Sequence, residues 1–579
     1  MADQPGYGAA GTSSCRASPV TGALPFSPAG WAGKAGASPF VLLLCLACLA
    51  LPWLNPYAGG PSSSVQPWLF SAACMALASA IQASGRLQPW VLVGLAAVSA
   101  WAIVTSGLDA DTIALAGACL LVFVAARMAA GGARQPKFVQ VIALSWLIAA
   151  CASTAMALCQ YFGLAQGLAP WINGSALGEA FANLRQRNQF ASLTVIGMAS
   201  LLWLSPRVLP RWAAIAAMAC LAAGNAATTS RTGLVQMLAL TLLTLAWPAP
   251  RRARATLWLV GLLAYGVAAL ALPALLEWAT GVAGNRLWDR VAAVDACSSR
   301  MVLWSNVLHL IAQKPWLGWG WGNLDYAHYV TLYPGARFCD ILDNAHNLPL
   351  HLAVELGVPA ALLACGAVLW ALGRARPWSE SDPARQMAWA VIAVIGAHSL
   401  VEYPLWYGPF QIAWGLCVGL LWPAPDGPNA PPFSPASLAL AAGIAAAGGY
   451  AAWDYHRVSQ IYLPPEARAP GYGDDPLPEI RRSWLFRHQA DFAELTITPL
   501  TRANAQWTFD TASAMLRYSP EPRVIEKLIE SAIALGRDDE ALLHMARYRA
   551  AFPEAYAKWS QDRPKTRRRG RVSPPDVVP

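Results

Sequence analysis

The 579-residue sequence has little charge, because Asp, Glu, Lys and Arg together make up only 13% of it, about half the share in an ordinary globular protein. Hydrophobic residues make up 56%. Apolar runs of roughly 17–25 residues, long enough to cross a hydrocarbon core of about 30 Å, recur from residue 40 to about residue 453. Most of the chain is therefore not a soluble protein, and we expect an all-α polytopic membrane protein.

The sequence also lacks the common motifs for nucleotides and structural zinc. It has no P-loop, no glycine fingerprint set between a strand and a helix as in a Rossmann unit, and no pair of Cys-x-x-Cys spacings. Asp109-Ala110-Asp111 matches the Asp-x-Asp pattern with which many sugar transferases hold a metal ion. It lies in a short turn without further ligands, whereas a hard divalent cation takes about six oxygens. We expect neither a metal nor a cofactor.

The net charge of +9 does not predict a nucleic-acid partner, because Lys and Arg in a polytopic chain mainly mark cytoplasmic loops. We expect about thirteen crossings, centred near residues 47, 76, 98, 120, 150, 197, 219, 240, 265, 359, 393, 414 and 444. With the N-terminus inside, the cytoplasmic turns collect Arg86, Arg127, Arg134, Lys137, Arg207, Arg211, Arg251, Arg252, Arg254, Arg374, Arg376 and Arg385. One cytoplasmic turn, residues 425–432, has no basic residue and gives this orientation no support.

This threading divides the chain into six parts. We expect a disordered cytoplasmic segment at 1–38, nine transmembrane helices within 39–276, a large periplasmic loop at 277–344, four more helices within 345–454, a periplasmic helical domain at 455–563 and a disordered basic tail at 564–579. The helical domain has paired apolar residues at helical spacing (524–525, 528–529 and 532–533) and a helix stop at Gly536, which together resemble a tetratricopeptide-type hairpin.

Most of the twelve cysteines lie in apolar helices, where a free thiol behaves as a small hydrophobic group. Cys297 and Cys339 are different, because both fall in the large polar loop. If that loop is periplasmic, they are candidates for a disulfide. The sequence leaves open whether they form one or remain two thiols.

Four groups of polar residues fall at the predicted periplasmic ends of different helices. They are 185–191 with Arg185, Arg187 and Gln189; 228–233 with Arg231; the long loop with Arg286, Arg290, Arg300 and, at its exit, His346; and 398–407 with His398, Glu402, Tyr403 and Tyr407. Ionisable groups at membrane depth are costly and usually face a cavity or each other. We therefore expect the four groups to share one polar cavity.

The residue types in this cavity suit a lipid-linked sugar. Guanidinium groups bind phosphate oxygens bidentately and keep their charge, and a histidine can accept a proton from a hydroxyl near neutral pH. Gln and Tyr can orient sugar or phosphate oxygens without adding net charge.

Each of these residues also has a structural interpretation. Arg185 and Arg187 could anchor the chain at lipid headgroups, and Arg300 could pair with Asp295 inside the loop. His346 could be no more than a helix cap, and Glu402 and Tyr403 could be structural polar contacts before Pro404. His351 and His398 are expected to be satisfied interhelical histidines.

At these positions the chain resembles the O-antigen ligase/polymerase superfamily and, within it, the bacterial protein O-oligosaccharyltransferases of the PglL (pilin glycosylation) type. The residues that carry the resemblance are Arg187-Asn188-Gln189-Phe190-Ala191, Ser230-Arg231-Thr232-Gly233, Arg300 to Trp304 with Pro315-Trp316-Leu317-Gly318-Trp319-Gly320, Ala345-His346-Asn347 with Glu355-Leu356-Gly357, and His398-Ser399-Leu400-Val401-Glu402-Tyr403-Pro404-Leu405-Trp406. The last segment and the soluble extension are more similar to the protein-ligase branch than to the lipopolysaccharide branch.

The resemblance implies a GT-C-like glycosyltransferase of the bacterial inner membrane, with its active site on the periplasmic side. It would transfer a preassembled oligosaccharide from undecaprenyl diphosphate to a Ser or Thr hydroxyl of a periplasmic, pilin-like protein, with inversion and without a metal. The family's roles fall on His346 for acceptor activation, on Arg231 and Arg300, with Arg187, for the diphosphate, and on Gln189, Tyr403 and Glu402 for substrate orientation. Tyr407 competes with Tyr403 for its role, because it lies one helical turn away.

Other functions stay open. An O-antigen ligase with a lipid A core acceptor, or an O-antigen polymerase, would share the fold and the donor site. A lipid or drug transporter would place polar groups near the membrane midplane and show internal repeats, whereas here they cluster at one face and no repeat is evident. A membrane scaffold with a partner-binding tail is the remaining alternative.

Overall fold

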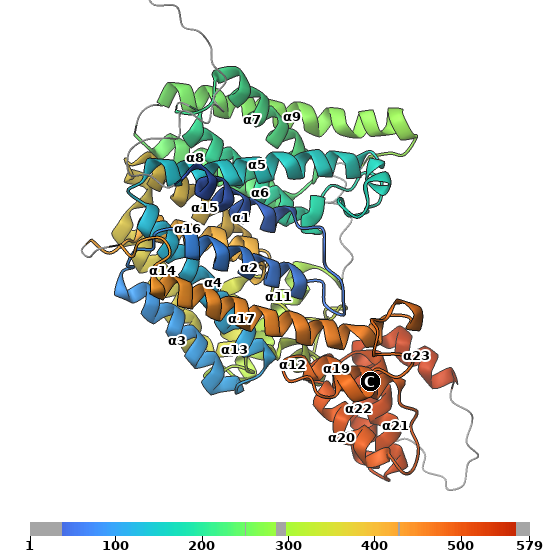
Figure 1. Ribbon diagram of the computed structural model, residues 1–579. Helices are drawn as coiled ribbons and strands as arrows, with labels where there is room; N and C mark the ends of the chain where they lie inside the picture. The colour runs from blue at the N-terminus through green and yellow to red at the C-terminus, as the bar shows by residue number, and fades with distance from the viewer. Residues whose placement is uncertain (1–37, 206, 249–250, 285–296, 426–428, 563–579) are drawn as a thin grey trace, which may run out of the picture.

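The computed structural model describes residues 38–562, apart from 206, 249–250, 285–296 and 426–428, as an assembly of helices (Figure 1). The predicted disordered ends lie outside the described residues, except for Ser38, and so do Arg286, Arg290 and Asp295. Within the described ranges there is no β-strand, and extended pairing is limited to two isolated bridges, Ser84 with Ala430 and Leu87 with Pro423. The all-α prediction is confirmed for this part of the chain.

The helices fall into a bundle, a loop region and a C-terminal region. The bundle contains α1 (Pro39–Leu54), α2 (Val65–Ile81), α3 (Pro89–Ser106), α4 (Ala110–Gly132), α5 (Pro136–Tyr161), α6 (Arg187–Leu204), α7 (Arg211–Ala227), α8 (Arg231–Ala246), α9 (Arg251–Thr280), α14 (Val358–Ala375), α15 (Pro383–Ser399), α16 (Gly408–Leu421) and α17 (Pro435–Ser459). The loop region contains α11 (Arg300–Gln313), α12 (Leu324–Val330) and α13 (Leu348–Leu356). The C-terminal region contains α18 (Leu477–Ile480), α19 (Arg487–Ile497), α20 (Ala505–Met515), α21 (Pro522–Ala534), α22 (Asp538–Ala551) and α23 (Pro553–Asp562).

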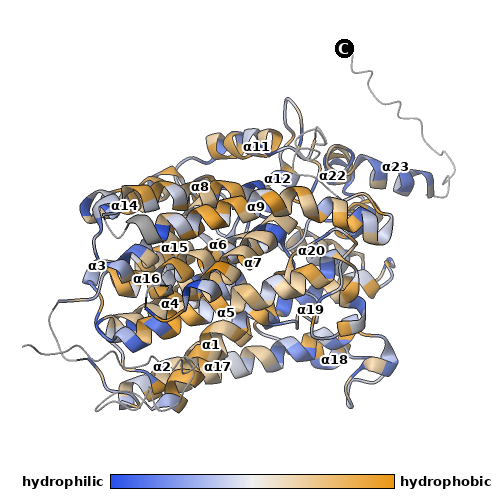
Figure 2. Ribbon diagram, turned by 90° about the horizontal axis from the view of Figure 1, so that it is seen from above, coloured by the Kyte–Doolittle hydropathy of each residue, from blue (hydrophilic) through white to orange (hydrophobic). Residues whose placement is uncertain are grey.

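The bundle is that of a multi-pass membrane protein. Six of the described helices are long and apolar enough to cross a membrane by length and composition, namely α3, α4, α5, α9, α14 and α17, and four shorter ones are also apolar, namely α1, α2, α8 and α16. Every one of the thirteen predicted centres falls inside one of the bundle helices. Whether all thirteen cross the membrane, and in which orientation, stays a prediction. Figure 2 shows hydrophobic residues along the bundle helices and more hydrophilic ones in α18 and α23.

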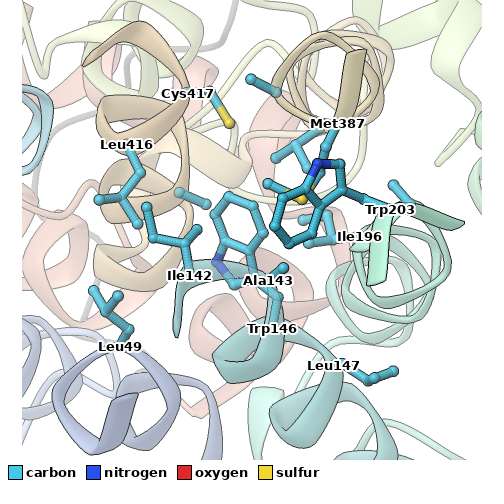
Figure 3. Packing of buried hydrophobic residues seen from close by; sticks show 14 of the residues in the cluster. Leu49, Ile142, Ala143, Trp146, Leu147, Ile196, Trp203, Met387, Leu416 and Cys417 are labelled. Atoms are coloured by element: carbon cyan, nitrogen blue, oxygen red, sulfur yellow. The ribbon is translucent and has the colours of Figure 1, made fainter. Parts of the chain in front are cut away.

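The bundle is held together by large side chains in its centre and by small residues where helices meet. Trp146 of α5 is fully buried and faces side chains of α1, α6, α15 and α16, among them Leu49, Ile196 and Met387 (Figure 3). On α16, a Cβ at Gly419 would lie 2.1 Å from the carbonyl oxygen of Ala126 on α4. Helices in lipid pack through such close backbone approach. Lipid tails are as apolar as the side chains, so no hydrophobic driving force draws the helices together.

The tenth predicted crossing differs from a single helix, because it is broken at Gly357 into α13 and α14. Gly357 has a φ of +90°, and a Cβ there would lie 2.1 Å from the carbonyl oxygen of Trp316. The glycine-tryptophan segment of the loop therefore packs directly on the break. Its N–H groups at Trp319 and Gly320 donate to the carbonyl oxygens of Val354 and Glu355, at 2.8 and 2.9 Å.

Glu355, at the end of α13, holds the same loop with its side chain. Its buried carboxylate accepts the backbone N–H groups of Gly322 at 3.0 Å and Leu324 at 3.2 Å, and His351 Nε2 lies 3.2 Å from it. A buried carboxylate is tolerated only when it is paired or hydrogen-bonded. The loop and the helix that follows His346 are thus one structural unit.

The C-terminal region packs on the loop through α12 and lies at one end of the bundle (Figure 1). The Tyr329 hydroxyl is 3.0 Å from His544 Nδ1 of α22, and the two rings stack with centroids 6.0 Å apart. Arg517 donates to Asn323 Oδ1 at 3.1 Å and covers the ring of Tyr326 at 4.5 Å. These contacts place the tail helices beside the segment that leads to His346.

We predict that Glu355→Ala loosens the glycine-tryptophan segment. The change leaves two N–H groups without an acceptor, which should cost roughly 2–4 kcal/mol. Thermal unfolding in detergent and protease cleavage within 314–323 would measure this. Asp340→Asn, which changes an exposed carboxyl in the same loop, is the control. Equal melting and equal cleavage of the two variants would contradict a holding role for Glu355.

Candidate functional site

Glu402 lies at the centre of the polar groups, in the turn between α15 and α16. Its carboxylate, about 10% exposed, pairs with the guanidinium of Arg300 and accepts a hydrogen bond from His346 Nδ1 at 2.8 Å. The Asn188 side chain donates to it at 3.4 Å. Three segments far apart in the sequence therefore meet at one carboxylate.

The charge of Glu402 is maintained by these neighbours. Burial alone would raise the pKa of its carboxyl group, but the hydrogen bond from His346 and the charges of His346 and Arg300 outweigh burial and hold the pKa below its ordinary value. Glu402 is therefore ionised at neutral pH. An ionised carboxylate on Nδ1 fixes the imidazole orientation and leaves Nε2 as the outward nitrogen.

The His346 backbone is fixed from three sides. The residue has a φ of +49°, in the left-handed region that a side chain other than glycine rarely adopts. Its N–H donates to Asn344 Oδ1 at 2.9 Å, and the indole of Trp304 donates to the neighbouring Ala345 carbonyl at 3.1 Å. Asn347 caps α13 by accepting the Leu350 N–H at 3.1 Å and donates to the Leu400 carbonyl at 3.0 Å.

Four helix N-termini meet around this network, and a side chain caps each of them. Gln186 caps α6, Ser230 caps α8, Ser299 caps α11 and Asn347 caps α13. The side-chain oxygen of each accepts a backbone N–H of the first turn, at 2.7, 3.1, 3.3 and 3.1 Å in that order. The Ser230 hydroxyl also donates to Asn188 Oδ1 at 2.6 Å, which links α8 to α6 and to Glu402. Helix N-termini carry partial positive charge and favour anions.

Strained backbone lies beside these termini. Of the six non-glycine residues with positive φ in the described part of the chain, Arg185, Thr229 and His346 stand immediately before the N-cap residues of α6, α8 and α13. Each such conformation costs about 1–3 kcal/mol and is typical of functional sites. The strain supports a site at this end of the bundle.

The predicted arginines have different surroundings. Arg231 begins α8 with an exposed side chain, for which the described residues offer no hydrogen bond or ion pair. Arg187 pairs with Glu179 at 3.5 Å, and Arg185 donates to the Pro56 carbonyl. Burial lowers the pKa of Arg185 below its ordinary value. Arg231 thus has all of its donors available, whereas Arg300 uses one nitrogen for Glu402.

Tyr403 and Tyr407 lie together. Their rings stack with centroids 6.1 Å apart, and the Gln189 side chain lies close enough to act on the ionisation of Tyr407. The Tyr403 ring packs against His346 at 5.0 Å. Burial raises the pKa of both tyrosines, so both hydroxyls remain donors at neutral pH. Both are therefore candidates for the substrate-orienting tyrosine, and Tyr403 is the one whose ring packs on His346.

Several residues have the structural roles considered for them. His398 contacts Ser192 Oγ at 2.8 Å inside the bundle, and His351 pairs with Glu355. Asp109 accepts the Thr112 N–H at 2.8 Å as the cap of α4. The described residues contain no group of three or more His, Cys, Asp or Glu that could hold a metal ion. Cys297 and Cys339 are joined in a disulfide, with Cα atoms 5.4 Å apart.

Two residues of the network had no assigned role in the sequence. Asn188 joins Ser230 to Glu402. It was noted in the sequence only as part of the segment Arg187-Asn188-Gln189 and was given no role there. Asp343 interacts electrostatically with His346, and beside burial it helps to raise the pKa of Tyr403 and Tyr407. Position within a motif was the available signal for Asn188, whereas Asp343 stands three residues before His346 and outside the motif segments.

Three family models match the chain in order along its length. A model described as protein glycosylation ligase matches residues 180–204, O-antigen ligase matches 216–365, and the C-terminal part of a virulence factor membrane-bound polymerase matches 386–566. The matched ranges contain Arg187, Arg231, Arg300, His346 and Glu402. The chain therefore resembles the O-antigen ligase superfamily in three successive segments.

Two curated bacterial proteins are similar to the chain over part of its length. A general O-oligosaccharyltransferase of Acinetobacter baylyi is 24% identical over 253 residues, which are 42% of this chain and 43% of that protein. A ComP-specific O-oligosaccharyltransferase of the same species is 27% identical over 124 residues, 21% of this chain and 22% of that protein. The chain thus spans less than half the length of the curated relatives it matches. The predicted resemblance to the superfamily and to its PglL-type branch is confirmed.

We predict that Glu402 makes the stability of the protein depend on pH in the acid range. Because the pKa of Glu402 lies below 4.5 in the folded protein, its ionised form stabilises the fold above pH 4.5 and loses this effect as the pH falls through the lowered pKa. Glu402→Gln should lower stability at pH 7 by about 1–3 kcal/mol and flatten the acid limb. Thermal unfolding from pH 3 to 7 (roughly the titration range of carboxyls) measures both.

The control is Glu277→Gln, which changes an exposed carboxyl at the end of α9. It should melt like the parent protein over the same range. A Glu402→Gln curve parallel to the parent curve at every pH would contradict the paired, ionised state of Glu402.

Proposed function

We propose that the protein transfers a preassembled oligosaccharide from undecaprenyl diphosphate to Ser or Thr hydroxyls of a periplasmic, pilin-like protein. The observation that carries the proposal is the Glu402 network, in which a histidine, an arginine and four helix N-termini are brought to one end of a membrane bundle. A histidine suits the acceptor hydroxyl, and an arginine beside helix N-termini suits the donor diphosphate.

The donor diphosphate binds at Arg231, with Arg187 and the remaining donors of Arg300 beside it. The ion pair with Glu402 neutralises Arg300 in part, so Arg231 supplies the main free charge. The capped N-termini of α6 and α8 lie next to it and add partial positive charge. Fixed cations stabilise the leaving diphosphate as its negative charge develops.

The polyprenyl chain follows the outer face of α8. Below Arg231, the exposed residues Val235, Leu238, Leu242 and Leu245 recur at a spacing that places them on one face of the helix. This face begins at the charged residue and continues into the membrane-spanning part of the bundle. A phosphate at Arg231 and an isoprenoid chain along this face match a lipid-linked donor.

The acceptor hydroxyl approaches from the side of His346. Nε2 takes the hydroxyl proton while the hydroxyl oxygen bonds to the anomeric carbon, and the bond from that carbon to the diphosphate oxygen breaks. Undecaprenyl diphosphate leaves with the electron pair, and attack from the opposite face inverts the anomeric centre. Glu402 stabilises the imidazolium that forms and keeps Nδ1 protonated, as the carboxylate does in other histidine–carboxylate pairs.

A protein acceptor is favoured over lipid A core or another glycan. The relatives that are most informative on this point are named O-oligosaccharyltransferases, and one family model is described as a protein glycosylation ligase. The other two models are described as an O-antigen ligase and a membrane-bound polymerase, which makes those activities the second candidates.

The deciding experiment uses a bacterium that makes an undecaprenyl-linked glycan and lacks its own ligase. The protein is co-expressed with a pilin-like acceptor, and Ser/Thr peptides of the acceptor are examined for the mass of the glycan. Glycan on the acceptor supports the proposal. Glycan on lipid A core or as longer polymers, with none on protein, would assign the sister activity instead.

We predict that His346→Ala lowers transfer about a hundredfold or more, the usual contribution of a positioned general base. The matched control is His456→Ala, which removes an exposed histidine at the end of α17. Both variants must reach the membrane at the level of the parent protein. Parent-like transfer by His346→Ala would remove this residue from the reaction.

We predict that Arg231 and Arg300 differ when they are replaced. Arg231→Ala should weaken binding of undecaprenyl diphosphate roughly ten- to a hundredfold, because it removes an unshared charge-assisted contact. Arg300→Ala should lower the rate more than the affinity, because it removes the cation paired with Glu402, the carboxylate that orients His346. Titration of purified protein with undecaprenyl diphosphate, with Arg482→Ala as the control, separates the two. Equal losses of affinity would contradict this division.

A further inference from the structure

Three aromatic residues meet at the far end of α17, where the bundle passes into the C-terminal region. Tyr450 and Trp453 belong to α17, and Trp484 belongs to the segment before α19. The ring of Tyr450 lies 5.8 Å from Trp453 and 6.4 Å from Trp484. All three are exposed, Tyr450 by 40%, Trp453 by 53% and Trp484 by 64%. An exposed tryptophan of the C-terminal region thus returns to the surface of a membrane helix.

The position of these rings along α17 matches the boundary of a bilayer. The helix begins at Pro435 and is long and apolar enough to span a membrane. At 1.5 Å per residue, Tyr450 lies about 22 Å and Trp453 about 27 Å from its start. A hydrocarbon core is about 30 Å thick. The three rings therefore lie where the core meets the headgroups, the level at which Trp and Tyr are enriched.

A buried carboxylate fixes the direction in which Trp484 points. Asp454 is fully buried and accepts the Ser483 hydroxyl at 2.9 Å and the Leu485 N–H at 3.0 Å. On the inner side of the same turn, Phe486 is buried against Tyr455 with ring centroids 5.0 Å apart. With Ser483 and Phe486 turned inward, the intervening Trp484 side chain faces outward beside Tyr450.

We propose that Trp484 inserts into the headgroup boundary of the membrane, together with Tyr450 and Trp453, and anchors the C-terminal region to the lipid surface. The exposed face of α17 continues from these rings along the span, so the surface beside Trp484 is already a lipid-facing one. An indole ring has an apolar body and one N–H donor, which suits this boundary.

The charges near Trp484 indicate how the anchor depends on the lipid. Arg482 pairs with Glu479 at 3.5 Å, and Arg487 pairs with Asp491 at 3.4 Å. Arg481 pairs with Glu494 in the same segment. These arginines are balanced by acids, so attraction to anionic headgroups adds little. The anchor therefore works in zwitterionic and anionic bilayers alike.

The anchor gives the C-terminal region a second point of attachment. The first is its contact with α12 through Tyr329 and His544, and the second is the membrane itself. Two attachments on different sides hold the region at a fixed height above the bilayer, next to the loop that carries His346. The inference depends on α17 spanning the membrane and not on the proposed transfer reaction.

The test is photo-crosslinking of the full chain in nanodiscs of phosphatidylcholine, and separately with added phosphatidylglycerol. The photoreactive amino acid p-benzoylphenylalanine replaces Trp484 in one variant, Tyr450 in a second and Leu542 in a third. Tyr450 is the lipid-facing reference. Leu542, 61% exposed on α22, is the matched apolar residue of the C-terminal region away from α17. Adducts are identified by mass spectrometry.

We expect phospholipid adducts at positions 484 and 450 in both kinds of nanodisc and none at 542. Lipid adducts at 450 but not at 484, or equal adducts at 484 and 542, would overturn the proposal. An adduct of position 484 with another protein would overturn it in favour of a protein partner. If a photoreactive variant aggregates, a nitroxide spin label on Trp484→Cys gives the same decision. Its accessibility to oxygen exceeds its accessibility to a water-soluble nickel complex only if the label lies in lipid.

Discussion

A carboxylate that is largely removed from water at the end of a membrane bundle must be paired, and the pairing of Glu402 determines how the surrounding segments are arranged. Its partners Arg300, His346 and Asn188 come from three separate parts of the chain. Removing one partner from such a charge costs more than the pair contributes, because an uncompensated charge is left behind. The four capped helix N-termini are consequently held within reach of one another, and the imidazole has one orientation.

A second buried carboxylate, Glu355, holds the loop in place, as Glu402 holds the segments of the site together. It binds backbone N–H groups of the glycine-tryptophan segment and lies on the helix that follows His346. The C-terminal region then packs on α12 of the same loop. The histidine is thus supported by bundle, loop and tail together, which explains why a residue with a strained backbone at φ +49° can be held in place.

The sequence predicts the bundle better than the contacts between its ends. Long apolar runs locate the helices because a membrane requires them, and the motifs locate His346 and Arg231 by position. For Arg300 the local sequence offered only nearby Asp295 as a possible acidic partner, whereas in the structure it pairs with Glu402, 102 residues away. The break at Gly357 was also missed, because it follows from the approach of the Trp316 carbonyl and not from helix propensity. Such long-range contacts depend on packing, which local pattern does not encode.

The division of charge at the site argues for two approaches to it. Arg231 lies at the top of an exposed apolar face of α8, which in the proposed reaction would lead the donor to it from the membrane. His346 lies on the loop side, between the Tyr403 ring and the segment packed on α12, where in the proposed reaction the acceptor would reach it from the aqueous side. Glu402 contacts both histidine and Arg300 and separates the two approaches. The proposed lipid-linked donor and soluble acceptor hydroxyl suit such an arrangement, because each can enter without displacing the other.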